Sequence, residues 1–197
     1  MDFKIIGCPE WGAIPPRHGF NSIIWTPGPA PGIIFHHTAG HHAEISLPRN
    51  ESHLEALMYR RAIQHYHMSP SPSDPSKPWN DSGDNFCVMR NGEIYQGRWR
   101  TIRAIQHQRM VVSAHCPGFN NWIGIEHEHA GHEEMPPIQK ESSAWLQAWI
   151  ASNYGKKDPL RVEPHSAHFS TTCPANLIDD IGDIRERANW LLDHSGV

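Results

Sequence analysis

A short apolar run that ends in two histidines places the strongest constraint on how this chain can fold. Residues 32–37 read GIIFHH and follow the proline- and glycine-rich stretch PGPAP. Such a run, bounded by residues that break regular structure, is typical of a buried strand inside a sheet. Because successive side chains of a strand point to opposite faces, only one of His36 and His37 can point to a given face. The chain must therefore build a sheet around this strand.

Other patterns supply the helices that such a sheet needs. Residues 52–67 open with Ser52 and Glu55 in capping-box spacing, followed by apolar residues at helical intervals, and predict a helix. Residues 138–154 predict a second helix because pairs of large apolar side chains recur four residues apart. A third helix is expected to begin with Asp183 as its cap.

Further strands complete the expected sheet. An Asn-Gly dipeptide joins residues 85–90 to residues 93–98 and predicts a hairpin with a tight turn. Residues 122–129 predict one more strand. Residues 68–84 (MSPSPSDPSKPWNDSGD) are rich in proline and serine and predict a long surface loop rather than an interdomain linker. The fold class is therefore α/β: one domain over residues 1–197, with a central mixed sheet flanked by helices.

The charge balance excludes two classes of partner. The 197 residues carry 17 Lys and Arg against 21 Asp and Glu, a net charge of −4, so no basic surplus is available for nucleic-acid or lipid phosphates. No stretch approaches the roughly 20 apolar residues of a membrane-spanning helix, and the opening MDFKIIGCP lacks a signal-peptide core. We expect a cytoplasmic protein without a nucleic-acid or membrane partner.

The 16 histidines point to metal or proton chemistry. The helical zinc signature H-E-x-x-H is absent, which excludes metallopeptidases of that type. A catalytic zinc site takes three protein ligands and keeps a fourth position open. One member of the histidine pair could join His165 and Cys173, which are eight residues apart in a late loop. Alternatively, these side chains are ordinary surface or core residues, and His168 competes with His165 as a ligand.

Six segments resemble one enzyme family in the same order along the chain. They are residues 10–16 (EWGAIPP), 34–39 (IFHHTA), 91–98 (NGEIYQGR), Ala114 and His115 with Asn120, 123–126 (IGIE), and 165–174, which ends in Cys-Pro. This pattern is similar to that of the zinc-dependent N-acetylmuramoyl-L-alanine amidases. The family includes phage endolysins, bacterial wall-recycling amidases and animal peptidoglycan recognition proteins.

The resemblance implies a zinc site in a surface groove and names its residues. The ligands of one Zn²⁺ ion would be His36, His165 and Cys173. Glu126 would serve as the general base, and Thr171 would help to polarise the scissile carbonyl. The implied reaction is hydrolysis of the amide bond between N-acetylmuramic acid and L-alanine in bacterial peptidoglycan. We expect the protein to be a monomer. Zinc suits this reaction because it lowers the pKa of bound water to about 7 and polarises carbonyl groups.

Four further residues are expected to contact the substrate, and some of these interpretations have alternatives. The four are His37, Asp84, His115 and Asn120. His37 could instead be a packed histidine that orients its neighbours, and His115 could only brace its loop. Asp84 stands where many family members have tyrosine, and it is the second choice for moving a proton. Glu128 lies on the same strand face as Glu126 and is the alternative functional carboxylate.

The biological setting has several interpretations. The paired cysteines of the animal recognition proteins find no match, which favours a phage or bacterial enzyme. The expected setting is a phage endolysin that stays in the cytoplasm until it is released to the cell wall. Alternatives are a cytoplasmic muropeptide-recycling amidase and a non-catalytic peptidoglycan-binding module. A histidine-rich metal buffer is a third class, and it predicts several metal ions of similar affinity instead of one tight zinc ion.

Overall fold

One mixed sheet forms around the buried strand that the sequence predicts. The structure is a computed structural model that describes residues 3–39, 52–72 and 74–194. The strands of this described part are β1 (Ile5–Ile6), β2 (Gly32–His37), β3 (Phe86–Val88), β4 (Ile94–Gln96), β5 (Ile123–His127) and β6 (Arg161–Pro164). Their order in the sheet is β1-β4-β3-β5-β2-β6. β2 pairs in parallel with β5 and β6, and β3 pairs in parallel with β5, while β3 and β4 are antiparallel.

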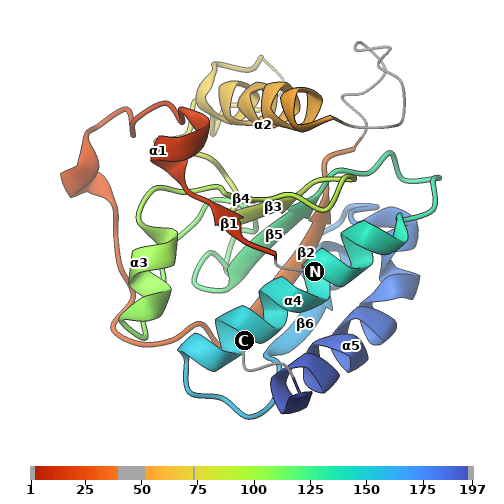
Figure 1. Cartoon of the computed structure of the whole chain (residues 1–197). Coiled ribbons are helices and arrows are strands. Elements are labelled where there is room, and N and C mark those ends of the chain that lie inside the picture. Colours follow the sequence, from red (N-terminus) through yellow and green to blue (C-terminus); the bar gives the residue numbers. More distant parts are fainter. Residues whose placement is uncertain (1–2, 40–51, 73, 195–197) are drawn as a thin grey trace.

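Helices cover both faces of the sheet. They are α1 (Cys8–Trp11), α2 (His53–Met68), α3 (Thr101–Gln106), α4 (Pro137–Asn153) and α5 (Ile181–His194), with short 3-10 helices η1 (Phe20–Ser22), η3 (His165–Ala167) and η4 (Ala175–Asp180). Figure 1 shows α2 above the sheet and the packed pair α4 and α5 below it. None of the helices in the described residues is long and apolar enough to span a membrane.

The two faces of the sheet carry different side chains because residues alternate along each strand. Toward α4 and α5, Phe35, Val88 and Ile125 join Leu146 and Ala188 in the larger apolar core. The α2 side has a smaller apolar core, built mainly around α1, α2 and β4. The polar ends of β2 and β5 on this second face are therefore left for the functional site.

Most of the sequence-based elements are confirmed, with small shifts at their ends. In α2, the Ser52 hydroxyl accepts the Glu55 N–H (3.3 Å), and Glu55 Oε2 accepts the Ser52 N–H (2.7 Å), as the capping-box spacing predicts. The hairpin forms between β3 and β4, with Gly92 at a φ of 86° in its turn. The expected cap Asp183 is wrong, because α5 begins at Ile181 and Asp183 lies in its first turn. The sequence analysis missed β1, α1, α3 and β6.

The proline- and serine-rich segment is a loop, as expected. From the end of α2 to β3, the described residues form no helix or strand beyond an isolated bridge between Ser71 and Asp74. The loop is not confined to the surface, because Asp81 and Asp84 near its end are buried. It therefore carries polar side chains into the interior next to α2.

A buried histidine ties the sheet to α4. His127 on β5 is fully buried, and its ring lies 4.4 Å from that of Phe35. Nδ1 donates to the His36 carbonyl at 3.2 Å, and Nε2 then accepts from the Ser143 hydroxyl at 2.9 Å. Acceptance at Nε2 requires the neutral ring, and burial lowers the pKa of His127 to about 3.

This histidine predicts a loss of stability in mild acid. In the unfolded chain His127 has a pKa of about 6.5, so below that pH the unfolded state binds one proton more than the folded state. His127 alone should lower the free energy of unfolding by up to about 1.4 kcal/mol per pH unit as the pH drops, and other buried histidines such as His67 and His115 add to the total slope. Urea denaturation between about pH 7 and pH 5 measures this slope. The variant His127→Gln should show a gentler slope, and equal slopes would contradict the assignment.

Candidate metal centre

Three side chains from distant parts of the chain converge at the end of β2. His36 is on β2, His165 begins η3 and Cys173 lies just before η4. One potential ligand atom from each lies within 4.8 Å of the others. His36 Nδ1 is 3.7 Å from Cys173 Sγ, close to the separation of about 3.6 Å that tetrahedral zinc–nitrogen and zinc–sulfur bonds require. The ring centroids of His36 and His165 are 4.4 Å apart.

The chemistry of these donors fits a zinc ion. Burial lowers the pKa of His36 and of His165, so both imidazoles are neutral and keep a lone pair for a metal. Burial raises the pKa of the Cys173 thiol to about 12, so a cation must displace its proton. His165 Nε2 is buried without a hydrogen-bond partner among the described residues. A set of two nitrogens and one sulfur with a fourth position open is a catalytic type of zinc site.

Backbone contacts hold the loop that carries two of these residues. The Ser166 N–H donates to the Cys173 carbonyl at 2.8 Å and closes the segment. The Thr171 hydroxyl oxygen accepts the Cys173 N–H at 3.2 Å. The His37 N–H donates to Cys173 Sγ at 3.4 Å. The hydrogen bond to Cys173 Sγ thus connects the loop of residues 165–173 to the end of β2.

The two adjacent histidines have different positions, as strand alternation predicts. His36 is buried and belongs to the ligand group, while His37 is half-buried and does not. The His37 ring lies near Gly131, and its contact with the site is the backbone N–H to Cys173. His168, the alternative ligand, pairs with Glu163 instead.

Glu126 lies next to His36 across the sheet. The two residues are register partners between β2 and β5 and share a face. Burial, with the negative charge of Asp84 second, raises the pKa of Glu126 to about 8. Its side chain keeps 13% of its exposure. Glu128 is fully buried and accepts the Arg90 N–H at 3.1 Å, so Glu126 is the carboxylate that a substrate could reach.

Asp84 lies in the interior, which corrects the expectation of a substrate contact. Its side chain is fully buried, and the guanidinium of Arg60 on α2 lies 3.2 Å from each carboxylate oxygen. The Ser82 hydroxyl donates to the same carboxylate at 2.5 Å. Arg60 is fully buried as well. Asp84 therefore acts as an internal counter-ion whose charge is felt by Glu126.

A second group with metal-binding residue types lies beside the first. His67, Asp84 and Glu126 also bring ligand atoms within 4.8 Å of one another. However, the Gly83 N–H donates to His67 Nδ1 at 3.1 Å, and Arg60 already compensates Asp84. Burial lowers the pKa of His67 to about 3, so the neutral ring carries its proton on Nε2, 3.6 Å from Glu126 Oε1. This group is therefore better suited to proton transfer at Glu126 than to binding a second metal ion.

Two other expected substrate contacts lie in one loop behind His36. His115 is buried, and both of its ring nitrogens are engaged within the protein. The Asn120 side-chain oxygen accepts the Cys116 N–H at 3.0 Å, and its carbonyl accepts the Ser113 N–H at 2.9 Å. Asn120 thus holds the loop together, and His115 takes the bracing position.

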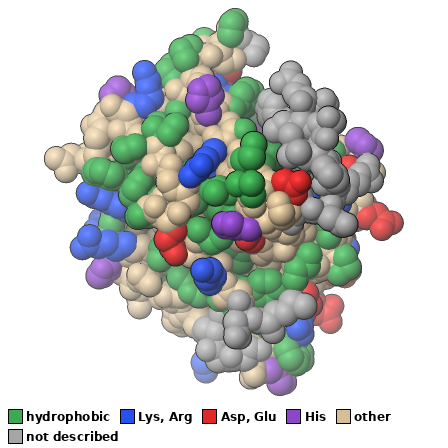
Figure 2. Space-filling model, turned by 45° about the horizontal axis from the view of Figure 1, so that its top comes forward, with side chains coloured by type: hydrophobic (Ala, Val, Ile, Leu, Met, Phe, Trp, Pro, Cys, Tyr) green, Lys and Arg blue, Asp and Glu red, His purple; other side chains and the backbone are tan. Residues whose placement is uncertain are grey.

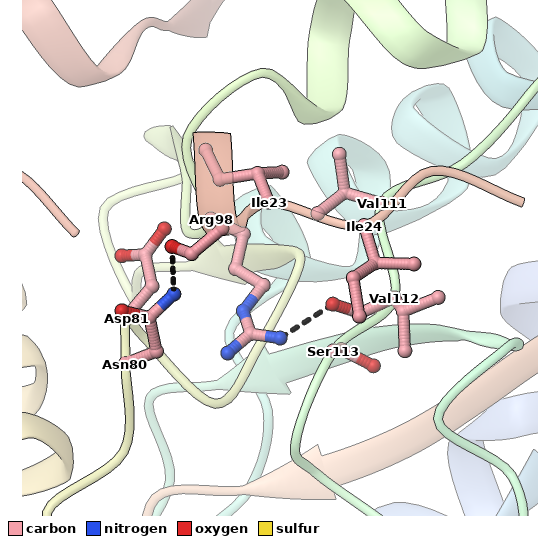
Figure 3. Close-up of a pocket in the computed structure, with 9 residues that line it drawn as sticks. Ile23, Ile24, Asn80, Asp81, Arg98, Val111, Val112 and Ser113 are labelled. Carbon is pink, nitrogen blue, oxygen red and sulfur yellow. Dashed lines mark hydrogen bonds between the residues drawn. The ribbon is translucent and has the colours of Figure 1, made fainter. Parts of the chain in front are cut away.

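A cavity of about 190 Å³ shares two loops with the site. Figure 3 shows Arg98 pointing into it between Asp81 and Val112, whose carbonyl accepts from the guanidinium. Arg98 Nε is buried and has no partner in the described part of the chain. Figure 2, which brings the α2 side forward, shows histidine and acidic side chains close together among hydrophobic ones near the middle of that face.

Sequence reasoning missed Arg60 and His67. Arg60 occupies the inward stripe of α2 together with Ala56 and Ile63, all of them buried. A charged residue on the apolar face of a helix indicates a buried partner, and that signal was available. His67 stacks on Trp79 at a centroid distance of 4.9 Å. Its closeness to Glu126 depends on how α2 packs on the sheet, which local pattern does not reveal.

Comparison with known proteins gives consistent matches. The profile of the family described as N-acetylmuramoyl-L-alanine amidase matches residues 26–176. Peptidoglycan-recognition protein LB of Drosophila melanogaster is 28% identical over 177 residues, which are 89% of this chain and 66% of that protein. For protein SC1a of the same species the identity is 27%, over 62% of this chain and 58% of the relative. The chain thus spans less than two thirds of these relatives.

Solved structures show the same fold. Wild-type Drosophila PGRP-LB superposes with a TM-score of 0.69 and 23% identity, covering 88% of this chain and 89% of the other. A tyrosine-to-phenylalanine mutant of PGRP-LB in complex with tracheal cytotoxin gives a TM-score of 0.68 and 24% identity, over 87% and 88% of the two chains. The expected α/β class with a mixed central sheet is confirmed.

The ligand group predicts a sharp difference between adjacent histidines. His36→Asn should abolish stoichiometric zinc binding because it removes one of three donors. His37→Asn should leave binding intact, because that residue contributes only a backbone N–H to the site. Metal analysis after dialysis against limiting zinc measures both. Retention of zinc by His36→Asn, or its loss in both variants, would exclude the proposed ligand set.

The buried ion pair predicts a large effect on stability. Arg60→Met leaves the Asp84 carboxylate uncompensated in the interior and should lower the free energy of unfolding by about 3–5 kcal/mol. The double variant Arg60→Met with Asp84→Asn should recover much of this loss. The neighbouring Arg61→Met is the control, since Arg61 is exposed. Urea denaturation compares the four proteins, and equal effects at positions 60 and 61 would contradict the ion pair.

Proposed function

The chain belongs to the N-acetylmuramoyl-L-alanine amidase family, and from this premise we propose that it is a zinc-dependent hydrolase of peptidoglycan. The bond cleaved is the amide between the lactyl group of N-acetylmuramic acid and L-alanine of the stem peptide. Water supplies the oxygen of the new carboxylate, and the departing nitrogen of alanine takes up a proton. The glycan strand thereby loses its cross-linking peptide.

One observation carries this proposal. The donor atoms of His36, His165 and Cys173 converge within 4.8 Å, and Glu126 lies beside His36 in the sheet. A recognition module needs neither a complete ligand set nor a carboxylate with a raised pKa next to it. When bound, a zinc ion would supply Lewis acidity toward the scissile carbonyl and water.

The chain's own residues would then move the protons. Glu126 would accept a proton from the attacking water and return it to the leaving nitrogen, and a pKa of about 8 suits both directions near neutral pH. His67 presents Nε2–H toward Glu126 and would steady the carboxylate between the two steps. The Thr171 oxygen accepts the Cys173 N–H, which leaves the hydroxyl proton free to donate to the developing oxyanion.

The cavity around Arg98 supports a binding role for the rest of the substrate. A buried guanidinium whose Nε has no partner among the described residues attracts a carboxylate. Its apolar wall contains Ile23, Ile24 and Val111. We assign the cavity to an acidic part of the stem peptide. The solved complexes of PGRP-LB and PGRP-LE with tracheal cytotoxin, named as a monomeric diaminopimelic acid-type peptidoglycan, accord with a muropeptide ligand.

For the biological setting, we propose a phage endolysin that acts as a monomer and remains in the cytoplasm until it reaches the wall at lysis. All four cysteines, at positions 8, 87, 116 and 173, are free and buried, which suits a reducing compartment. A muropeptide-recycling amidase would share this compartment. It would differ by preferring soluble fragments to intact wall, so parallel assays on both substrates separate the two.

The decisive experiment measures stem peptides released from purified peptidoglycan. The native protein should generate new N-terminal alanine, and chelator treatment should abolish it. Glu126→Gln should reduce the rate at least about 100-fold, the lower range for loss of a general base, while zinc content stays the same. Glu128→Gln is the matched control on the same strand face and should retain most activity. Wall binding without peptide release by the native protein would favour the recognition module.

A further inference from the structure

A chain of two hydrogen bonds runs from His36 into the protein interior, away from the metal centre. We propose that His115 is a positioning residue that fixes the tautomer and ring orientation of His36, so that Nδ1 of His36 faces the metal. The inference rests on the proposed zinc site and assigns His115 a structural function there. The residue would act on the ligand and not on the substrate.

The tautomers of both histidines follow from the hydrogen-bond partner at the interior end of this series, the Trp122 carbonyl. The Trp122 carbonyl can only accept, so His115 Nε2, at 3.1 Å, must carry a proton and donate it. A neutral imidazole carries one proton, so with Nε2–H donating to Trp122 the Nδ1 of His115 holds a lone pair. His36 Nε2 lies 2.8 Å from this Nδ1 and must be the donor. His36 Nδ1 is then unprotonated, and it is the atom 3.7 Å from Cys173 Sγ.

The sheet leaves space for the His115 ring at one position. Gly124 on β5 lies directly beneath it, and a Cβ on that glycine would meet His115 Cδ2 at 2.4 Å. The Gly124 N–H donates to the Asn85 side chain at 2.9 Å, which keeps the strand in place. The ring is nearly perpendicular to that of His36, at an interplanar angle of 82°. This arrangement keeps Nδ1 of the His115 ring directed at Nε2 of the His36 ring.

The loop that carries His115 is braced on both sides of it. Asn120 accepts hydrogen bonds from Ser113 and Cys116, which flank the histidine. His115 is consequently an acceptor with a fixed direction. Without it, the His36 Nε2–H would be buried with no partner, and the ring could turn its protonated nitrogen toward the metal. Partners of this kind typically change metal affinity about 10- to 100-fold when they are removed.

A pair of nearly isosteric variants isolates the acceptor. In His115→Asn the side-chain oxygen can take the place of Nδ1, whereas His115→Leu offers similar volume and no acceptor. Both lose the bond to Trp122, so that loss cancels in the comparison. Zinc affinity, measured by competition with a chromophoric chelator, should fall about 10- to 100-fold in the Leu variant. The Asn variant should stay within about threefold of the native protein. His107→Leu, at an exposed histidine, is the control.

A measurement on the native protein needs no substitution. Two-bond ¹H–¹⁵N correlation spectra of the zinc-loaded protein should show both His36 and His115 as the Nε2–H tautomer. An Nδ1–H tautomer of His115, or equal zinc affinities of the Asn and Leu variants, would overturn the proposal. Peptide release from the wall is scored separately. If the protein binds zinc as described but releases no stem peptide, the proposed activity is wrong, while the proposed role of His115 still stands.

Discussion

The parallel pairing of β2 with β5 is the interaction on which the site depends. In this register His36 lies opposite Glu126, so a metal ligand and a carboxylate share one face at neighbouring positions. The opposite face of the same two strands supplies Phe35 and Ile125 to the apolar core against α4 and α5. Burial on that side fixes the register, because a slip would expose the core residues. The geometry of the site is therefore maintained by hydrophobic packing on the far side of the sheet.

A buried ion pair organises the charges on the α2 side of the sheet. Arg60 compensates Asp84, and Asp84 in turn disfavours the ionised form of Glu126. Arg60 and Asp84 are both fully buried, so the interior next to Glu126 holds a closed ion pair. The cost of burying both charges is reduced by the hydroxyl of Ser82, which donates to the carboxylate.

Much of this architecture can be predicted from the sequence, because the signals are local. The capping box of α2, the Asn-Gly hairpin and the apolar run of β2 depend on neighbours a few residues apart. β1 and β6 escaped prediction because they are short and lack a periodic pattern. Among the site residues, His36, His165 and Cys173 follow from a motif. The interior position of Asp84 and the contacts of His67 and His115 depend on tertiary packing and could not be predicted in this way.

Strand alternation also limits how the chain can change in evolution. Inserting one residue within β2 before Phe35 would bring Phe35 to the position of His36 and turn His36 to the opposite face of the sheet. Such a change would remove a ligand and an apolar contact together. Length variation near the site is therefore confined to connections such as the proline-rich loop after α2, or to paired changes within a strand. Homologues should differ in loop length while they keep the spacing inside these two strands unchanged.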